Sequence, residues 1–432
     1  MTHREIKNTF LDFFKDRGHK IVPSSSLIPE DESVLFTTAG MQQFKSYYLN
    51  EESPYGNRAA SIQKCLRTSD IEEVGDESHL TFFEMLGNFS FNFPQGEGSY
   101  FKEEAIKAGY DLIVGEFKVP LENVKISVFR GSPENNVPED RESFEIWKSL
   151  GIPEDKILFG SIGDNFWGPT GDKGPCGPTT EIHINDLEVW NIVFNEYFCN
   201  ASRESLLKGE ADLVPLHRKG VDTGMGLERL VMILQGKSNV FETDLFIPLI
   251  TEIRGKDLYD YESNKRSERI IADHLKAAAF IISDGQNPSN LGRGYVLRRL
   301  IRRIMSHSKK LNLPADFLER SLKTLGNIYE EEYPELEKKS GEILNVFNQE
   351  FEKFEKVLDK GIKEFEKGIV KFDKSIPGEY AFGFQQSAGV TFDIMQDIAK
   401  ELGKEINKEE FKEEEQKHKE VSKASQDRKF KR

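Results

Sequence analysis

Hydrophobic side chains near the N-terminus recur every three or four residues, which predicts an amphipathic helix that ends at Gly18. This stripe is formed by Ile6, Phe10, Phe13 and Phe14. Up to about residue 245, short β-rich runs such as residues 124–129 and 181–184 alternate with helical stretches, and glycine and proline are frequent. The first half of the chain is therefore predicted to contain both strands and helices.

From about residue 250 onward, strand signals almost vanish and the hydrophobic pattern becomes helical. One apolar stripe at near-heptad spacing consists of Phe347, Phe351, Phe354, Leu358, Phe365 and Ile369. It predicts a long amphipathic helix that packs on its own domain, because the stripe is too short for a coiled coil. We expect two domains, residues 1–248 and 249–432, and a charged C-terminal helix within residues 401–432.

A glycine-rich run at residues 221–229 combines a turn, the start of a helix and an arginine. Gly224 and Gly226 carry no Cβ, so a ligand can approach the backbone closely. Arg229 stands where the predicted helix begins, and its planar, permanently charged guanidinium is suited to phosphate. An ordinary helix start shows the same pattern, so this run alone does not define a function.

Two predicted strands flank a polar loop that begins at Arg67 and ends at His79. Because the loop joins two strands, these side chains are expected to converge on one anion. Phe83 lies four residues beyond His79 and offers a flat face on which a base can stack. A surface ion pair for Arg67 and a purely structural role for His79 are the alternative interpretations.

The composition is that of a soluble globular protein with two or three domains, because 37% of the 432 residues are hydrophobic and 31% are charged. The chain has neither a run of 18 apolar residues nor an N-terminal signal-peptide pattern, so we expect a cytoplasmic protein that binds no membrane. Cys65, Cys176 and Cys199 show no Cys-x-x-Cys spacing. Neither a disulfide framework nor a zinc site is therefore expected.

The net charge of −15 disfavours nucleic-acid binding unless positive charge is concentrated locally. Residues 291–310 provide such a concentration, with seven lysines and arginines, one histidine and no acidic residue. Hydrophobic residues at helical spacing in the same stretch are Val296, Leu297, Leu300, Ile301 and Ile304. We expect a helix with one buried face and one basic face that binds RNA or phosphate, with a merely solvated face as the alternative.

Three segments resemble, in their order along the chain, the signature motifs of class II aminoacyl-tRNA synthetases. They are the N-terminal helix with residues 19–23, the segment from Lys64 to Glu84, and residues 221–229. Longer strings are similar to the alanyl-tRNA synthetase family, from about residue 5 to the C-terminus. These strings lie at residues 39–41, 81–91, 164–167, 174–178, 190–194, 222–229 and 292–299.

The resemblance implies an α+β fold, with an antiparallel β-sheet flanked by helices as the aminoacylation domain, followed by a mostly α-helical tRNA-recognition domain. It also implies ATP-dependent activation of L-alanine and transfer to the 3′ end of tRNA-Ala, with ATP and Mg²⁺ as cofactors. The attacking carboxylate is already ionised, so the site needs positioning and positive charge. Arg67 would bind the α-phosphate and Arg229 the γ-phosphate. His79 would be a secondary phosphate contact, and adenine would lie between Phe83 and Arg229.

For the amino acid, the resemblance assigns Asp222 to the ammonium group, Asn191 to orientation and Trp167 to closing the pocket. The implied pocket wall consists of Met41, Val193 and Gly224. A helix N-cap for Asp222 and a core position for Trp167 are the structural alternatives. Glu181 is a weaker candidate for magnesium or the ammonium group. The implied tRNA-binding residues are Arg293, Arg298, Arg299, Arg302, Arg303, Lys309 and Asp393.

The chain also departs from the family. The loop after Arg67 is short and acidic, with Glu72 and Glu73, where the family usually has a longer loop with a lysine. Lys309 stands where the family has the asparagine that, with an aspartate matching Asp393, reads a G·U pair of the acceptor stem. The family continues into a zinc-binding editing domain and a C-terminal domain. We therefore expect no editing domain here, and a separate chain with those domains is a candidate partner.

Two other functions fit parts of this pattern. The first is a paralogue that loads an activated amino acid onto an acceptor other than tRNA, which the basic helix disfavours. The second is a catalytically idle tRNA-binding paralogue. The joint presence of Arg67, Phe83, Asp222 and Arg229 disfavours it, because an idle site has no physical need for them.

Overall fold

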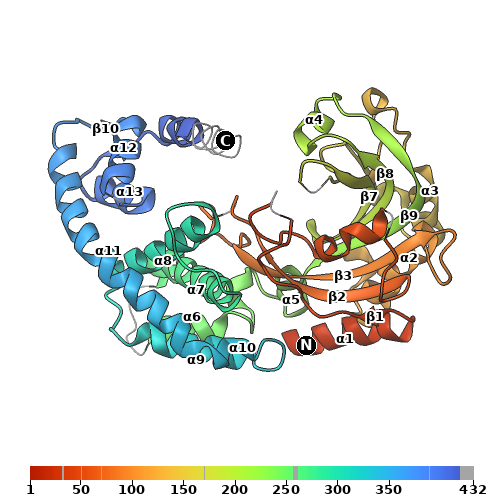
Figure 1. The fold of residues 1–432 in the computed structure, drawn as a ribbon, viewed down its shortest axis with the longest axis horizontal. Coiled ribbons are helices and arrows are strands. Elements are labelled where there is room, and N and C mark those ends of the chain that lie inside the picture. Colours follow the sequence, from red (N-terminus) through yellow and green to blue (C-terminus); the bar gives the residue numbers. More distant parts are fainter. Residues whose placement is uncertain are drawn as a thin grey trace.

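The computed structural model describes residues 1–31, 34–49, 51–69, 71–169, 171–255, 261–388 and 390–418. A nine-stranded sheet carries helices on its faces, and a helical region lies beside it (Figure 1). In spatial order the strands are β1 (Lys20–Ile21), β2 (Arg58–Leu66), β3 (Phe82–Phe93), β9 (Leu213–Gly226), β8 (Leu187–Cys199), β7 (Gly174–Ile184), β4 (Val124–Phe129) and β5 (Ile157–Gly160). The short β6 (Phe166–Trp167) pairs with β7.

The predicted antiparallel sheet is confirmed for the central strands, whereas the two edge pairs are parallel. At one edge, α3 (Arg141–Ser149) follows β4 and precedes β5, and so supplies the crossover that a parallel pair needs. At the other edge, the 3₁₀ helix η1 (Gly40–Tyr48) lies between β1 and β2 in sequence. The direction of each edge strand follows from the connection that precedes or follows it. The hydrophobic pattern of the strand itself does not show this direction.

The predicted N-terminal helix is confirmed as α1 (His3–Asp16). It begins with a capping box between Thr2 and Glu5, and it ends shortly before Gly18, whose φ is +79°. Its four predicted apolar residues are at most 5% exposed. The other α-helices of this half are α2 (Lys102–Tyr110), α4 (Arg203–Leu207) and α5 (Leu227–Leu234).

A two-residue turn joins β7 to β8 and sets how these strands pair. Asn185 and Asp186 both have positive φ, at 52° and 65°, which suits the tight turn of a twisted hairpin. Past one irregularity, Glu181 lies opposite Asn191 on the neighbouring strand. β8 then pairs with β9 so that Asn191 lies opposite Gly224. The hairpin therefore brings residues from three strands to one place.

Beyond residue 246 the described chain is almost entirely helical, as predicted. The helices are α6 (Ile247–Arg254), α7 (Tyr261–Ser283), α8 (Gly292–Lys310), α9 (Phe317–Ile328), α10 (Glu335–Lys338), α11 (Ser340–Ile369), α12 (Gly378–Ala388) and α13 (Phe392–Glu401). The short strands β10 (Ser375–Ile376) and β11 (Glu405–Ile406) pair in parallel. Residues 408–418 are helical, and the basic end at residues 428–432 lies outside the described residues. Helices α8 and α11 confirm the two predicted ones.

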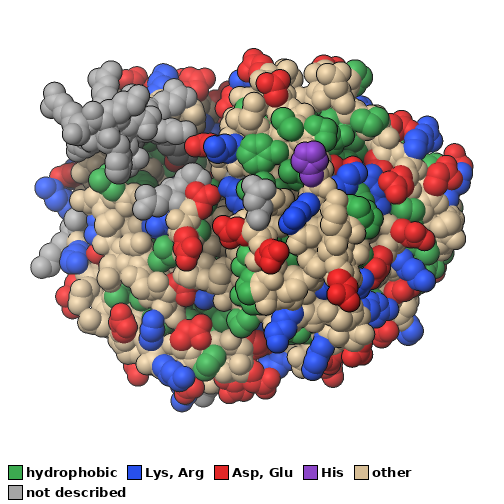
Figure 2. All heavy atoms as spheres, turned by 45° about the vertical axis from the view of Figure 1, so that its right-hand side comes forward, with side chains coloured by type: hydrophobic (Ala, Val, Ile, Leu, Met, Phe, Trp, Pro, Cys, Tyr) green, Lys and Arg blue, Asp and Glu red, His purple; other side chains and the backbone are tan. Residues whose placement is uncertain are grey.

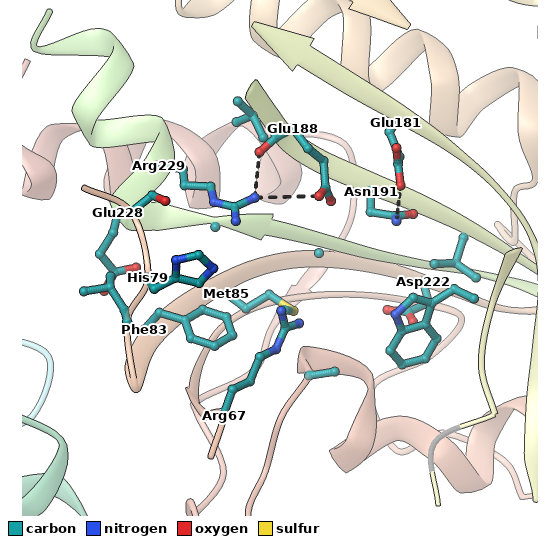
Figure 3. Close-up of a pocket in the computed structure, with 18 residues that line it drawn as sticks. Arg67, His79, Phe83, Met85, Glu181, Glu188, Asn191, Asp222, Glu228 and Arg229 are labelled. Carbon is teal, nitrogen blue, oxygen red and sulfur yellow. Dashed lines mark hydrogen bonds and ion pairs between the residues drawn. The ribbon is translucent and has the colours of Figure 1, made fainter. Parts of the chain in front are cut away.

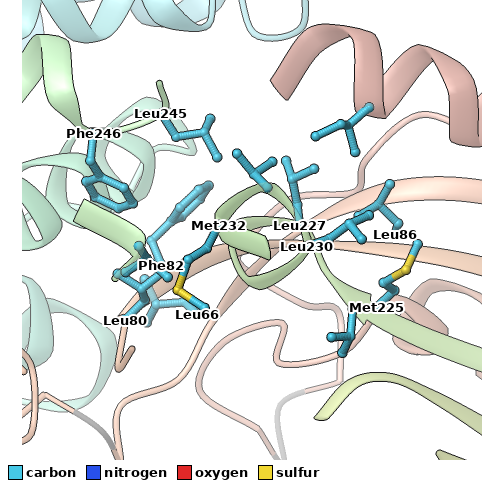
Figure 4. Close-up of a cluster of buried hydrophobic side chains, with 14 of the residues drawn as sticks. Leu66, Leu80, Phe82, Leu86, Met225, Leu227, Leu230, Met232, Leu245 and Phe246 are labelled. Atoms are coloured by element: carbon cyan, nitrogen blue, oxygen red, sulfur yellow. The ribbon is translucent and has the colours of Figure 1, made fainter. Parts of the chain in front are cut away.

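One hydrophobic core extends from the sheet into the helical region as far as Phe347. Phe82 of β3 stacks on Phe280 of α7 with ring centroids 4.2 Å apart. Leu227 and Leu230 of α5 point into the same core (Figure 4). A second core cluster joins the end of α11 to the elements that follow it. The predicted domain boundary at residue 248 lies within the first core and stays a prediction.

Acidic and basic side chains are interspersed over the face of the molecule shown in Figure 2. Neither sign of charge is collected in one patch on this face. Among the described helices, none is long and apolar enough to cross a membrane.

Gly177→Ala is expected to destabilise the fold, because its Cβ would lie 1.8 Å from the carbonyl oxygen of Phe194. β7 and β8 would have to separate at the point where β7 also pairs with Trp167. A loss of roughly 1–3 kcal/mol in the free energy of unfolding is expected from urea titration. Gly341→Ala on α11 is the control, since no atom lies within 4 Å of its new Cβ. Equal losses in both variants would contradict this interpretation.

Candidate active site

A pocket of about 330 Å³ opens over β3, β8, β9 and the start of α5 (Figure 3). It brings together most residues that the sequence predicted for ATP and the amino acid. Those that line it are Arg67, His79, Phe83, Trp167, Glu181, Asn191, Val193, Asp222, Gly224 and Arg229. Met41 is the predicted pocket residue that does not line it.

The two arginines enter this pocket from opposite sides (Figure 3). Arg67 follows β2, and its guanidinium lies 4.9 Å from the ring centroid of Phe83. Arg229 stands in the first turn of α5. Its Nη1 donates to the carbonyl oxygen of Glu188 at 3.0 Å and lies 3.6 Å from the carboxylate of the same residue. One positive charge is thus presented from the end of a strand, and the other from the start of a helix.

His79 reaches the pocket from the loop before β3, and Asp76 fixes its position. Oδ1 of Asp76 accepts the backbone N–H groups of Ser78 and His79 at 3.0 and 2.8 Å. Oδ2 of Asp76 lies 2.5 Å from Nδ1 of His79, a contact that orients the imidazole. Asp76 was not predicted from the sequence, although an aspartate three residues before a histidine in a polar loop is a signal for such a turn.

Polar and small residues gather at the other end of the pocket. Asp222 is 5% exposed, and burial raises its pKa to about 7. Val193 lies opposite Asp222 on the neighbouring strand. Nδ2 of Asn191 donates to Oε1 of Glu181 at 3.0 Å, and its own Oδ1 is buried without a hydrogen-bond partner in the described structure. A buried carboxylate beside an unsatisfied amide oxygen is suited to binding a cationic donor such as an ammonium group.

The alternative role of Asp222 as a helix N-cap is wrong. Asp222 lies within β9, and Gly226 is the residue that precedes the first turn of α5. The strand therefore directs this carboxylate towards the pocket instead of towards a helix end.

Met85 lines the pocket, whereas Met41 belongs to a core cluster and is 1% exposed. The backbone N–H of Gly40 points to Sδ of Met85 at 3.3 Å. A Cβ on Gly224 would lie 2.8 Å from the same sulfur. Met85 was not predicted from the sequence, although alternate strand residues share a face and Phe83 is two positions away.

Glu181 and Glu188 are the carboxylates in this pocket that suit a metal ion. Burial, and then the charge of Glu181, raise the pKa of Glu188. The carboxylate of Glu181 accepts a hydrogen bond from the hydroxyl of Ser127 at 2.8 Å and another from Nε2 of His183 at 3.1 Å. The described residues contain no cluster of three or more metal-ligating side chains. Mg²⁺ commonly uses one or two carboxylates with substrate phosphates and water, so this donor set fits that ion.

Two fully buried carboxylates support the pocket from behind, and each adjoins a pocket residue in sequence. Glu84 pairs with Lys7 at 2.9 Å and accepts a hydrogen bond from Tyr333 at 3.0 Å. Glu228, which also lines the pocket, pairs with Lys276 at 2.8 Å. Glu228 further accepts the backbone N–H of Glu84 at 3.1 Å. This network was not predicted from the sequence, because its members are far apart in the chain.

The arginines of α8 form a less open basic surface than predicted, because acids from other elements pair with them. Partners are Glu350 for Arg298, Glu72 for both Arg299 and Arg303, Glu355 for Lys309, and the Val34 carbonyl for Arg293. Arg303 is only 2% exposed, and Arg302 lies over the ring of Phe354. Asp393 lies on α13, but its side chain is outside the described part of the chain.

Comparison with known proteins points in one direction. The profile of the family tRNA synthetases class II (A) matches residues 5–432. The chain is 42% identical to an alanine--tRNA ligase of Borreliella afzelii over 100% of this chain and 74% of that protein. It is 44% identical to one of Treponema denticola over 74% of this chain and 55% of that protein. A solved pyrrolysyl tRNA synthetase of Desulfitobacterium hafniense aligns with 55% of this chain and 71% of its own, at 15% identity and a TM-score of 0.32.

Asp222→Asn is expected to make the protein more stable at pH 8 and to leave its stability unchanged below about pH 4. The folded-state pKa of about 7 lies above the value near 3.9 of an unfolded aspartate. Ionisation therefore opposes folding above pH 7, and this effect fades as the pH falls towards 4. Urea titrations across this range test it, with the exposed Asp212→Asn as the control. The same pH trend in both variants would refute the assignment.

Proposed function

The chain belongs to the alanine--tRNA ligases of the class II tRNA synthetases, and from this we propose that it activates L-alanine with ATP and transfers it to tRNA-Ala. One observation carries the proposal: a single pocket joins two arginines suited to phosphates with a buried carboxylate suited to an ammonium group. ATP and an amino acid must meet in such a pocket for their charged groups to react.

In the first step, a carboxylate oxygen of alanine attacks the α-phosphorus of ATP and pyrophosphate leaves. The nucleophile is already charged, so catalysis depends on alignment and on positive charge around the phosphates. Arg67 stabilises the charge that develops on the α-phosphate. Arg229 binds the γ-phosphate and exchanges its contact with the Glu188 carboxylate for it. The positions of both guanidiniums across the pocket from each other support these roles.

The remaining groups of this end orient the nucleotide. Adenine stacks on Phe83, and His79, held by Asp76, adds a phosphate contact. Mg²⁺, when bound to the phosphates, supplies further positive charge. Glu181 and Glu188 would hold it, and both line the pocket.

The amino acid is bound at the other end. Asp222 pairs with its ammonium group, and the unsatisfied oxygen of Asn191 accepts a second N–H from it. Trp167 and Val193 limit the space for the side chain. Met85 closes the floor, since its sulfur already lies too close for a Cβ on Gly224.

In the second step, a hydroxyl at the 3′ end of tRNA-Ala attacks the activated carbonyl and AMP leaves. We assign the tRNA surface to α8 and the cavity beside it, where Arg298, Arg299 and Arg302 lie together. Arg293, Lys309 and Asp393 extend this assignment along α8 and α13, whereas Arg303 contributes from within the core.

Arg67→Ala and Arg229→Ala are each expected to reduce alanine-dependent ATP–pyrophosphate exchange by about 10²–10³-fold, the effect of losing one transition-state donor. Both variants should stay folded, because both side chains face the pocket instead of the core. Arg141→Ala, an exposed arginine on α3, is the matched control and should exchange at the wild-type rate. Wild-type exchange in either pocket variant would refute the site.

Asp222→Asn is expected to raise the KM for alanine about ten- to hundredfold and to leave the KM for ATP unchanged, because a charged hydrogen bond is lost. In the wild type, the KM for alanine should rise as the pH falls below about 7, where the carboxyl is protonated. The variant should show no such rise. A change confined to the KM for ATP would show that Asp222 has another role.

A further inference from the structure

Residues 71–80, here called the bridging loop, border two cavities at once. Ser78 and His79 line the pocket described above. Glu72 lines a second cavity of about 210 Å³ that lies between α8 and residues 385–415. The first residues of the bridging loop include Glu72 and Glu73 of the acidic stretch after Arg67 in which the chain departs from its family, and the proposed function gives Glu72 no role.

Glu72 bridges two arginines that lie one turn apart on α8. Its Oε2 accepts from Nη1 of Arg303 at 3.0 Å, and its Oε1 accepts from Nη2 of Arg299. Burial favours a neutral carboxyl, but the charges of Arg303 and Arg299 outweigh it and lower the pKa of Glu72 to about 2. Carboxylates and phosphates are both anions that accept paired, charge-assisted hydrogen bonds from guanidinium groups.

Solvent reaches this contact from the cavity. The side chains of Glu72 and Arg299 are 34% and 22% exposed, whereas Arg303 is buried and also donates through Nε to Nε2 of His274 at 2.9 Å. An anion that enters the cavity can therefore compete for Arg299, while Arg303 keeps its place in the core.

The backbone of the bridging loop lies directly on α7 and leads from Glu72 to His79. Arg269 donates to the carbonyl oxygen of Asp76 at 2.8 Å. Gly75 has a φ of +110°, and a Cβ on it would lie 2.8 Å from Cγ of Arg266. Asp76 then holds both the backbone and the imidazole of His79. Glu72 and His79 are thus joined by a short segment that is closely packed on α7.

We propose that Glu72 occupies the place of an RNA phosphate on α8. An RNA phosphate that binds Arg299 displaces this carboxylate and shifts the bridging loop, so that RNA binding changes the setting of His79 in the first pocket. This inference rests on the proposed function, in which the RNA is tRNA-Ala. By linkage, ligands of the first pocket must then change the affinity for RNA by the same factor as RNA changes theirs.

The test compares Glu72→Gln with Glu73→Gln, which removes the same charge from an exposed neighbour in the bridging loop. The dissociation constant of a tRNA-Ala transcript is measured with and without α,β-methylene-ATP plus alanine. In the wild type and in Glu73→Gln, these ligands should change it about fivefold or more. Glu72→Gln should bind tRNA more tightly than Glu73→Gln does. The ratio of its dissociation constants with and without the ligands should fall towards one.

Equal tRNA affinity in the two variants, or an undiminished ligand effect in Glu72→Gln, would overturn the proposal. So would a wild type that binds tRNA with no ligand effect. A wild type that does not bind tRNA at all would overturn the proposed function and this inference with it.

Circular dichroism first shows whether Glu72→Gln is folded. This control is needed because the substitution removes the negative charge that pairs with the buried guanidinium of Arg303. If it is not folded, amide hydrogen exchange of the wild type decides. Binding of tRNA should accelerate exchange in residues 71–80, and unchanged or slower exchange there would overturn the proposal.

Discussion

Four buried charges form the contact on which the rest of the architecture depends: Glu84 with Lys7, and Glu228 with Lys276. A carboxylate left in the interior without its cation costs several kcal/mol, so α1, β3, α5 and α7 must meet at this point. Because Glu228 also accepts the backbone N–H of Glu84, the strand and the helix that form one end of the pocket are held together. The shape of the pocket therefore depends on how the helical region packs against the sheet.

Elements with a strong period were predictable from the sequence, and their pairing was not. α1, α5, α8 and α11 each bury one apolar stripe, which a short segment displays by itself. The parallel edges of the sheet depend on which connections cross over, and a strand's own residues do not record that. Most of the pocket was also predicted, because Arg67, Phe83, Asp222 and Arg229 lie in strings that resemble a known family. Met41 was expected in the pocket wall, but Met85 lines the pocket and Met41 is buried.

Charge was the property that the sequence described least well. The stretch over α8 contains no acidic residue, and a basic surface was the natural expectation. The acids that pair with α8 come from the loop after β2 and from α11. Glu72 and Glu350 thus neutralise arginines that are distant from them in the chain. The same cause hid Asp76 and Glu188, whose importance comes from what they touch in three dimensions. Local charge patterns thus predict where charged side chains lie, and tertiary contacts determine how many of them are already paired within the protein.

The long helix α11 carries the second core cluster on its far end. Met305 of α8 packs on Phe354, which is 1% exposed, and the helix continues to Ile369. The 15 residues beyond Phe354 span about 22 Å at 1.5 Å per residue. Such a segment acts as a lever arm: a tilt of about 10° at Phe354 moves its tip by about 4 Å. The packing of Phe354 on Met305, together with Ile362 and Ile394, therefore sets the distance between α8 and the second core cluster.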